Sequence, residues 1–268
     1  MSPAVVSKAA SVIESIKNNL GSKQTIDAFE LLINNTLETQ GHKPIKNNNP
    51  NHLPRIYDPR CINADTNIDG LAAGLKQTKS GRICIYGPPG TGKTAYGRWL
   101  AEQLEMPLMV KRGSDIISKW VGDTEKNIAK VFKVAEADGA LLLIDEIEGF
   151  LQDRRNTQNN WETSAVNEML TLMESYSGVF MASTNLIDTL DQAALRRFDL
   201  KLKFDFLLPD QSWRLLKSYC KALKLPTPNS KTKHGLDHLQ NITPGDFAAI
   251  MRRHRFKPLK SPMKSLLF

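Results

Sequence analysis

The sequence predicts an α/β fold in which a parallel β-sheet lies between two layers of helices. Three short, almost continuous apolar runs have the composition of parallel strands, which are usually buried on both faces; they span residues 83–86, 140–144 and 178–182. Between them, apolar residues recur at three- and four-residue spacing, the pattern of amphipathic helices. Because strands that alternate with helices form parallel sheets, we expect a three-layer α/β/α core.

The other elements are predicted from the same two periodicities. Two further strands are expected at residues 107–110 and 200–206, and three helices at residues 95–104, 123–137 and 164–176. After Pro209 the pattern is helical again, with helices expected around residues 213–219, 235–239 and 243–255. Thr243 and Pro244 occupy capping positions at the start of the last of these helices.

These patterns divide the chain into three parts. Residues 1–54 are expected to be a short helical N-terminal segment followed by a linker rich in Asn and Pro. Residues 55–207 are expected to be the large α/β domain, and residues 208–268 a small helical lid domain. The N-terminal helices are equally compatible with an adaptor, an oligomerisation element and a cap on the core.

A glycine-rich loop separates the strand at residues 83–86 from the helix at residues 95–104. The loop has the form GxxxxGK[ST], in which backbone N–H groups surround phosphate, the lysine reaches the β- and γ-phosphates, and the hydroxyl binds Mg²⁺. The start of the helix adds the positive end of its dipole. We therefore expect a nucleoside triphosphate site formed by Gly87, Pro88, Pro89, Gly90, Thr91, Gly92, Lys93, Thr94 and Ala95.

Two carboxylates, Asp145 and Glu146, follow the second buried strand. Open α/β sheets bind their ligands at the carboxyl ends of the strands. Asp145 is expected to hold Mg²⁺ together with Thr94, and Glu146 to orient the water that attacks the γ-phosphate. The simpler alternative is a strand that ends in polar residues because the sheet ends there.

Three further polar residues are candidates for contact with the γ-phosphate. Asn185 follows the third buried strand, where its amide would sense phosphate or place water, although such a residue often caps a turn. Arg196 and Arg197 precede the strand at residues 200–206. A guanidinium group suits developing negative charge because it is planar and permanently charged. An ion pair with Asp199 is the simpler alternative.

Composition limits the remaining possibilities. The chain has 268 residues, 41% of them hydrophobic, and contains neither an apolar run long enough for a membrane span nor a signal-peptide core. We therefore expect a cytoplasmic protein without membrane contact. The three scattered cysteines favour neither a disulfide framework nor a metal site. The net charge of +8 permits nucleic-acid contact, but a site for ATP also needs positive charge.

Taken together, residues 62–253 resemble the AAA ATPases of the AAA+ superfamily. GPPGTGKT at residues 87–94 resembles the family's Walker A motif, LLLIDEIEGF at 141–150 its Walker B motif, and STN at 183–185 its sensor 1. ALRRFD at residues 194–199 is similar to the second region of homology. The resemblance implies a P-loop ATPase that uses ATP and Mg²⁺ and assembles into a homo-oligomeric ring, expected to be a hexamer.

The resemblance also implies roles for single residues. SKWVGDTEKNI at residues 118–128 is similar to the segment with the pore loop, so Trp120, Val121 and Gly122 would line a central channel, although a lone tryptophan is more often buried. The first arginine finger corresponds to Arg197. Leu200 occupies the position of the second, for which Arg196 is a possible substitute.

Two more correspondences concern the nucleotide. TPGDFAAI at residues 243–250 is similar to a family segment whose glycine approaches the nucleotide, and Gly245 is the matching residue. Asn63 lies in the segment that packs against the adenine in the family. Arg252 and Arg253 are both candidates for a sensor 2 arginine.

Three functions are compatible with these features. The first is a ring-forming ATPase that remodels an unidentified protein substrate with its Trp120 loops. The second is a nucleotide-switched assembly or nucleic-acid-associated module without protein translocation, compatible with the basic C-terminal residues. The third, a P-loop kinase or GTPase, is disfavoured because the sequence lacks Asn-Lys-x-Asp and carries the Asp-Glu pair.

Overall fold

The computed structural model describes residues 53–54, 56–118, 120, 122–151 and 160–262, which belong to one compact unit. The helices and linker predicted for residues 1–52 lie outside the described residues, and so does Val121. No helix within the described ranges is both long and apolar enough to cross a membrane.

A six-stranded sheet in the order β1-β6-β2-β5-β4-β3 forms the centre of the fold. The strands are β1 (Asn63–Ala64), β2 (Gly81–Tyr86), β3 (Leu108–Arg112), β4 (Leu141–Asp145), β5 (Val179–Thr184) and β6 (Leu200–Asp205). Strands β2 to β6 pair in parallel, as predicted, whereas β1 pairs antiparallel with β6. The sequence did not predict β1, because a strand of two residues has no periodicity to detect.

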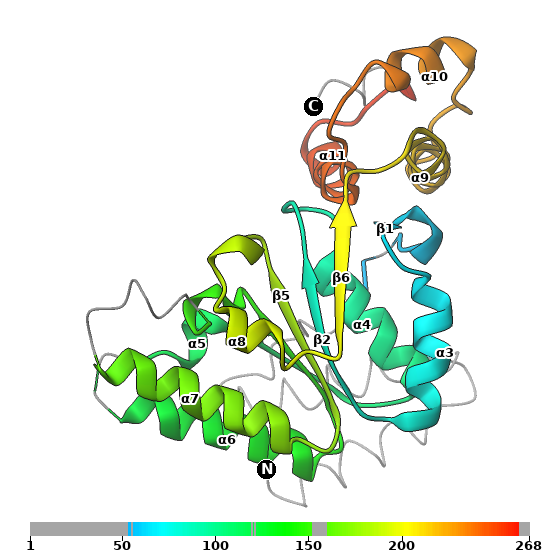
Figure 1. Cartoon of the computed structure of the whole chain (residues 1–268). Helices are drawn as coiled ribbons and strands as arrows, with labels where there is room; N and C mark the ends of the chain where they lie inside the picture. The colour runs from blue at the N-terminus through cyan, green and yellow to red at the C-terminus, as the bar shows by residue number, and fades with distance from the viewer. Residues whose placement is uncertain (1–52, 55, 119, 121, 152–159, 263–268) are drawn as a thin grey trace, which may run out of the picture. The chain divides into compact units, whose positions relative to one another are not determined.

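Helices cover both faces of the sheet (Figure 1). The helices of this layered core are α3 (Ile68–Thr78), α4 (Lys93–Leu104), α5 (Gly113–Ile116), α6 (Asp123–Ala137), α7 (Asn160–Ser175) and α8 (Gln192–Leu195). Helix α6 has the bounds that the sequence predicts. Helix α3 was not predicted, because Gly70 and Gly74 lower its helix propensity; the Asn67 side chain caps it by accepting a hydrogen bond from the Gly70 N–H at 3.0 Å.

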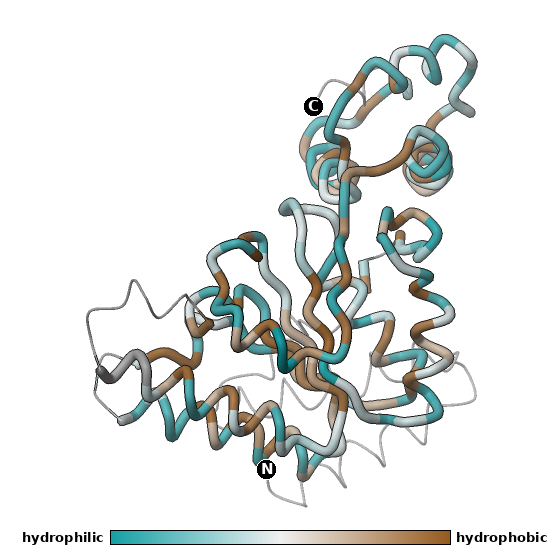
Figure 2. The backbone as a smooth tube through the Cα atoms, in the orientation of Figure 1, coloured by the Kyte–Doolittle hydropathy of each residue, from teal (hydrophilic) through white to brown (hydrophobic). Residues whose placement is uncertain are grey.

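Alternate residues of each central strand face opposite layers, which confirms the three-layer core. Leu142 and Ile144 of β4 pack in one hydrophobic cluster with residues of α6 and α7, whereas Leu141 and Leu143 pack with residues of α3 and α4. All four are completely buried. Figure 2 shows the hydrophobic residues gathered where the strands meet.

Three helices follow β6: α9 (Pro209–Ala222), α10 (Ser230–Asp237) and α11 (Pro244–Phe256). They enclose a third hydrophobic cluster, to which Cys61 also contributes and in which the rings of Tyr219 and Phe247 lie 5.6 Å apart. Helix α10 begins five residues earlier than predicted, because the Asn229 side chain caps it by accepting from the Thr232 N–H. The division into a large domain and a lid at residue 207 stays a prediction.

Candidate functional site

The loop between β2 and α4 depends on glycine at three positions. Gly87, Gly90 and Gly92 have φ angles of 136°, 81° and 97°, which side chains disfavour. At Gly87 a Cβ atom would also lie 1.9 Å from the backbone oxygen of Phe204 in β6. The backbone of the loop is therefore uncovered by side chains at the glycine positions of the motif.

Lys93 is the first residue of α4, and its side chain points into the loop. Its ammonium group donates hydrogen bonds to the carbonyl oxygens of Gly87 (2.7 Å) and Pro88 (2.9 Å) and to Oδ1 of Asn185 (2.7 Å). Burial lowers the pKa of Lys93, and the nearby Asp145 carboxylate opposes this shift. Lys93 and Asn185, two predicted site residues 92 positions apart in the chain, are thus in direct contact beside the glycine-rich loop.

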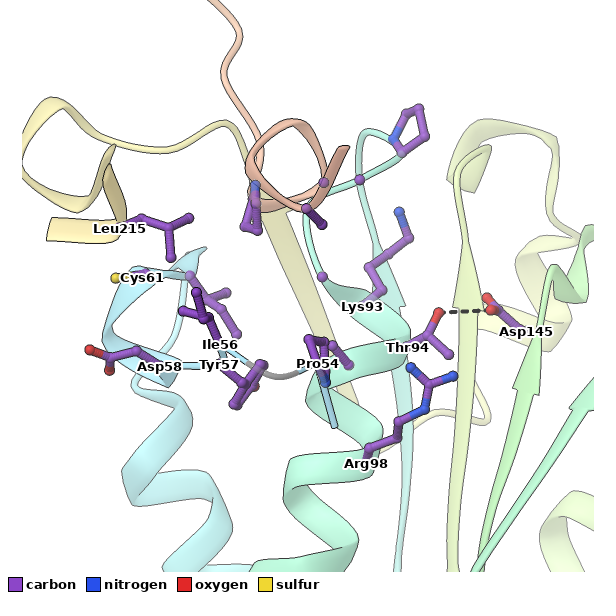
Figure 3. Close-up of a pocket in the computed structure, with 18 of the residues that line it drawn as sticks. Pro54, Ile56, Tyr57, Asp58, Cys61, Lys93, Thr94, Arg98, Asp145 and Leu215 are labelled. Atoms are coloured by element: carbon purple, nitrogen blue, oxygen red, sulfur yellow. Dashed lines mark hydrogen bonds between the residues drawn. The ribbon is translucent and has the colours of Figure 1, made fainter. Parts of the chain in front are cut away.

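Asp145, at the end of β4, accepts hydrogen bonds from two hydroxyl groups. The Thr94 hydroxyl donates to Oδ2 at 2.7 Å (Figure 3), and the Ser183 hydroxyl donates to Oδ1. A threonine hydroxyl beside a carboxylate is a set of hard oxygen ligands of the kind that Mg²⁺ prefers. In the part of the chain that the structure describes, no group of three or more His, Cys, Asp or Glu residues could hold a metal ion.

Glu146 occupies an unusual backbone conformation. Its φ and ψ angles of 58° and 51° lie in the left-handed region, which costs a non-glycine residue about 1 kcal/mol or more. Its carbonyl oxygen packs against the start of α5, where a Cβ atom on Gly113 would lie only 2.6 Å away. The turn thus presents the exposed Glu146 side chain directly after β4.

These residues line one cavity of about 350 Å³. The predicted site residues among its lining are Pro89, Gly90, Gly92, Lys93, Thr94, Ala95, Asp145, Glu146, Asn185 and Gly245. An apolar wall that includes Cys61, Ile62, Leu215 and Pro244 completes the lining, and Figure 3 shows Cys61 and Leu215 on the side away from Asp145. Burial raises the pKa of the Cys61 thiol to about 11, so this side of the cavity carries no thiolate near pH 7.

Helix α11 contacts the glycine-rich loop through backbone atoms. The N–H of Gly245 donates to the carbonyl oxygen of Gly90 at 2.9 Å. A Cβ atom on Gly245 would lie 2.9 Å from Gly90 Cα, and one on Gly90 would lie 2.7 Å from the Thr243 hydroxyl. Glycine at both positions is therefore what allows this approach.

Several predicted residues lie away from the cavity. The Asn63 amide donates to the carbonyl oxygen of Phe206 at 2.7 Å, and Asn63 is not part of the cavity lining. Arg196 is exposed, and Arg197 forms an ion pair with Glu174.

Trp120 and Gly122, the two predicted pore-loop residues that the structure describes, also lie elsewhere, in the turn between α5 and α6. The Trp120 side chain is 76% exposed, so this tryptophan is not a core residue. Gly122, with a φ angle of 82°, is the N-cap residue of α6.

Arg98 and Ser183 are polar residues of the site that were not among the predicted site residues. Arg98 stands one helical turn after Thr94 on α4 and lines the cavity, with its buried Nε atom lacking a partner among the described residues. Burial lowers the pKa of Arg98, and Asp145 opposes this shift. The sequence could have indicated Arg98 through its four-residue spacing from Thr94, which places both residues on the same face of a helix. Ser183, inside the STN motif, contacts Asp145 from the neighbouring strand.

Comparisons with known proteins agree with this geometry. Residues 83–206 match the model of the "ATPase family associated with various cellular activities (AAA)". Over 144 residues the chain is 37% identical to Tat-binding homolog 7 of Caenorhabditis elegans, an alignment that covers 49% of this chain and 11% of that protein. Over 203 residues it is 28% identical to Fidgetin-like protein 1 of Caenorhabditis briggsae, covering 73% and 34%.

The chain thus spans about a tenth of the first of these relatives and about a third of the second. The region that matches the family model contains the glycine-rich loop, the Asp-Glu pair and Asn185, which the structure brings to one cavity. Residues 83–206 are therefore an AAA domain, the domain that gives this family of ATPases its name.

Proposed function

We propose that this chain binds ATP in the cavity and hydrolyses it in the presence of Mg²⁺. The observation that carries the proposal is a pair of hydrogen bonds, from Lys93 to Asn185 and from Thr94 to Asp145, each 2.7 Å long. Both lie at the carboxyl ends of β2, β4 and β5. Thr94 and Asp145 would hold Mg²⁺, which supplies neutralisation of phosphate charge when bound.

In this proposal the chain's own residues divide the work on the triphosphate. Backbone N–H groups of residues 90–92 surround the phosphates, since Pro88 and Pro89 have no N–H to donate, and Lys93 exchanges its loop carbonyl partners for β- and γ-phosphate oxygens. Glu146 orients the attacking water, and the Asn185 amide detects the γ-phosphate. The apolar wall around Ile62 accommodates the base. Asn63 supports this wall as part of β1, and its side chain does not contact the base.

The same proposal extends to a ring. Arg197 does not line the cavity of its own chain, so as an arginine finger it would complete the site of a neighbouring copy. The exposed Trp120 would contact a protein substrate in the channel of a hexamer, together with Val121 and Gly122 as the resemblance implies. We further propose a cytoplasmic location, and a division into an N-terminal segment (1–54), an ATPase domain (55–207) and a lid (208–268).

Lys93→Met tests the nucleotide site. The substitution removes a buried charged donor with three hydrogen bonds, so the affinity for ATP should fall about 10- to 100-fold, as expected for loss of a charged hydrogen-bond partner. Titration with a fluorescent ATP analogue measures it. Lys130→Met, an exposed lysine on α6, is the matched control and should bind normally. Equal affinity of the two variants would contradict the assignment.

Gly113→Ala tests the support beneath Glu146. The added methyl group would lie 2.6 Å from the Glu146 carbonyl oxygen, so the turn must shift and the carboxylate with it. We expect a destabilisation of about 1–3 kcal/mol, as for an overpacked core, and slower hydrolysis with unchanged ATP affinity. Gly74→Ala on α3 is the control, because a Cβ atom there meets nothing within 4 Å. Normal hydrolysis by a folded Gly113→Ala variant would contradict the proposal that Gly113 supports the Glu146 turn.

A further inference from the structure

The backbone directly after Arg197 is fixed by the next two residues. The Phe198 side chain is 3% exposed and stacks on Phe180 of β5, with the ring centroids 6.1 Å apart. Asp199 is bound to Arg82 of β2 by its carboxylate, which accepts from the Arg82 N–H at 2.8 Å and from the guanidinium at 2.9 Å. The direction of the Arg197 guanidinium is therefore decided by its side-chain torsions.

One side of that guanidinium is held by Glu174. The Arg197 Nε–H donates to Glu174 Oε1 at 2.5 Å, across 23 residues of chain. Glu174 belongs to the last turn of α7, a helix whose inner face is buried in the core through residues such as Met173. The acceptor therefore stands on a rigid element.

The geometry of the bond leaves the outer edge of the guanidinium available. A guanidinium carries five N–H donors in a planar fork, of which Nε–H is one and the two terminal NH₂ groups supply four. Glu174 occupies Nε–H, and the described residues offer the terminal groups no other hydrogen bond. The side chain of Glu174 is 49% exposed and that of Arg197 is 33% exposed, so a second molecule can reach the terminal NH₂ groups.

The adjacent arginine differs in this respect. Arg196 is exposed, and no described residue forms a hydrogen bond or ion pair with its side chain. Of these two consecutive arginines, only Arg197, which precedes the buried Phe198, is restrained by an ion pair with a described residue. A group that must meet a phosphate in a defined direction benefits from such a restraint, because fewer torsions remain to be fixed when it acts.

We propose that Glu174 is a positioning residue for the arginine finger, fixing the plane of the Arg197 guanidinium so that its terminal NH₂ groups face the γ-phosphate bound by a neighbouring copy. The inference rests on the proposed function of Arg197 in trans. It makes Glu174 act on the turnover of the neighbouring subunit and not on nucleotide binding by its own chain.

A mixing experiment with the full chain tests this. Arg197→Ala chains keep an intact cavity but donate no finger, and Glu146→Gln chains donate a finger but do not turn over. Mixed together, they should recover hydrolysis at sites where an Arg197→Ala cavity meets a Glu146→Gln neighbour. Adding Glu174→Gln to the finger donor should lower the recovered kcat about three-fold with KM unchanged, as expected for a partly exposed ion pair. Adding it to the Arg197→Ala chain should change nothing.

The controls separate the two levels of the proposal. Glu168→Gln on the same helix, placed in the donor, should leave the recovered rate unchanged, and thermal unfolding should show that Glu174→Gln remains folded. If the two parent variants recover no activity on mixing, the trans site itself is wrong. If they recover activity and Glu174→Gln acts equally in donor and acceptor, or not at all, the trans site stands and the positioning role of Glu174 is wrong.

Discussion

Glu146→Gln should bind ATP as tightly as the unchanged chain and hydrolyse it at least about 100-fold more slowly, the scale expected for loss of a general base. The amide has the shape of the carboxylate but does not attract the proton of an attacking water. Binding should persist, because none of the hydrogen bonds of Lys93 or Asp145 involves the Glu146 side chain. Phosphate release under saturating ATP, with a separate binding titration, measures both quantities.

Glu125→Gln on α6 provides the control, since it makes the same chemical change outside the cavity lining. It should hydrolyse ATP at the rate of the unchanged chain. Turnover by Glu146→Gln within two-fold of that rate would remove Glu146 from its proposed role. A loss of ATP binding would show instead that the strained turn after β4 holds the site together.

Arg197→Ala should lower kcat by about 10³-fold, the lower end of the effect of an arginine finger, with little change in ATP affinity. Affinity should persist because Arg197 lies outside the lining of its own cavity. The rate per chain of the unchanged protein should also fall on dilution, as neighbours dissociate. Hydrolysis rates over a concentration series, with sedimentation to follow assembly, measure this.

Arg196→Ala is the informative comparison, because it removes the exposed neighbouring arginine and leaves the Glu174 ion pair in place. We expect it to have the smaller effect. A larger effect for Arg196→Ala would transfer the finger to that residue. Full activity at dilutions where only monomer remains would contradict a shared site altogether.

The fold was largely predictable because its strands are buried on both faces. Strands β4 and β5 carry almost unbroken apolar runs, so their positions were visible without any tertiary information. Elements with weaker local signals were missed or displaced. Helix α3 contains two glycines, and α10 is mainly polar, with its start decided by the cap at Asn229.

The candidate site was predictable where one motif contains the chemistry. Lys93, Thr94 and Asp145 stand at spacings that a phosphate loop and an acidic strand end require. Contacts between distant segments were not predictable in this way. The approach of Gly113 to Glu146 and the pairing of Glu174 with Arg197 depend on where α5 and α7 pack, and no local pattern records that.

The backbone contact between Gly90 and Gly245 has a mechanical consequence. Helix α11 has 13 residues and a length of about 20 Å, and it is pinned to the phosphate loop at its first turn. A tilt of only about 10° about this contact would therefore carry Phe256 at the other end of the helix roughly 3 Å, given the rise per residue of an α-helix.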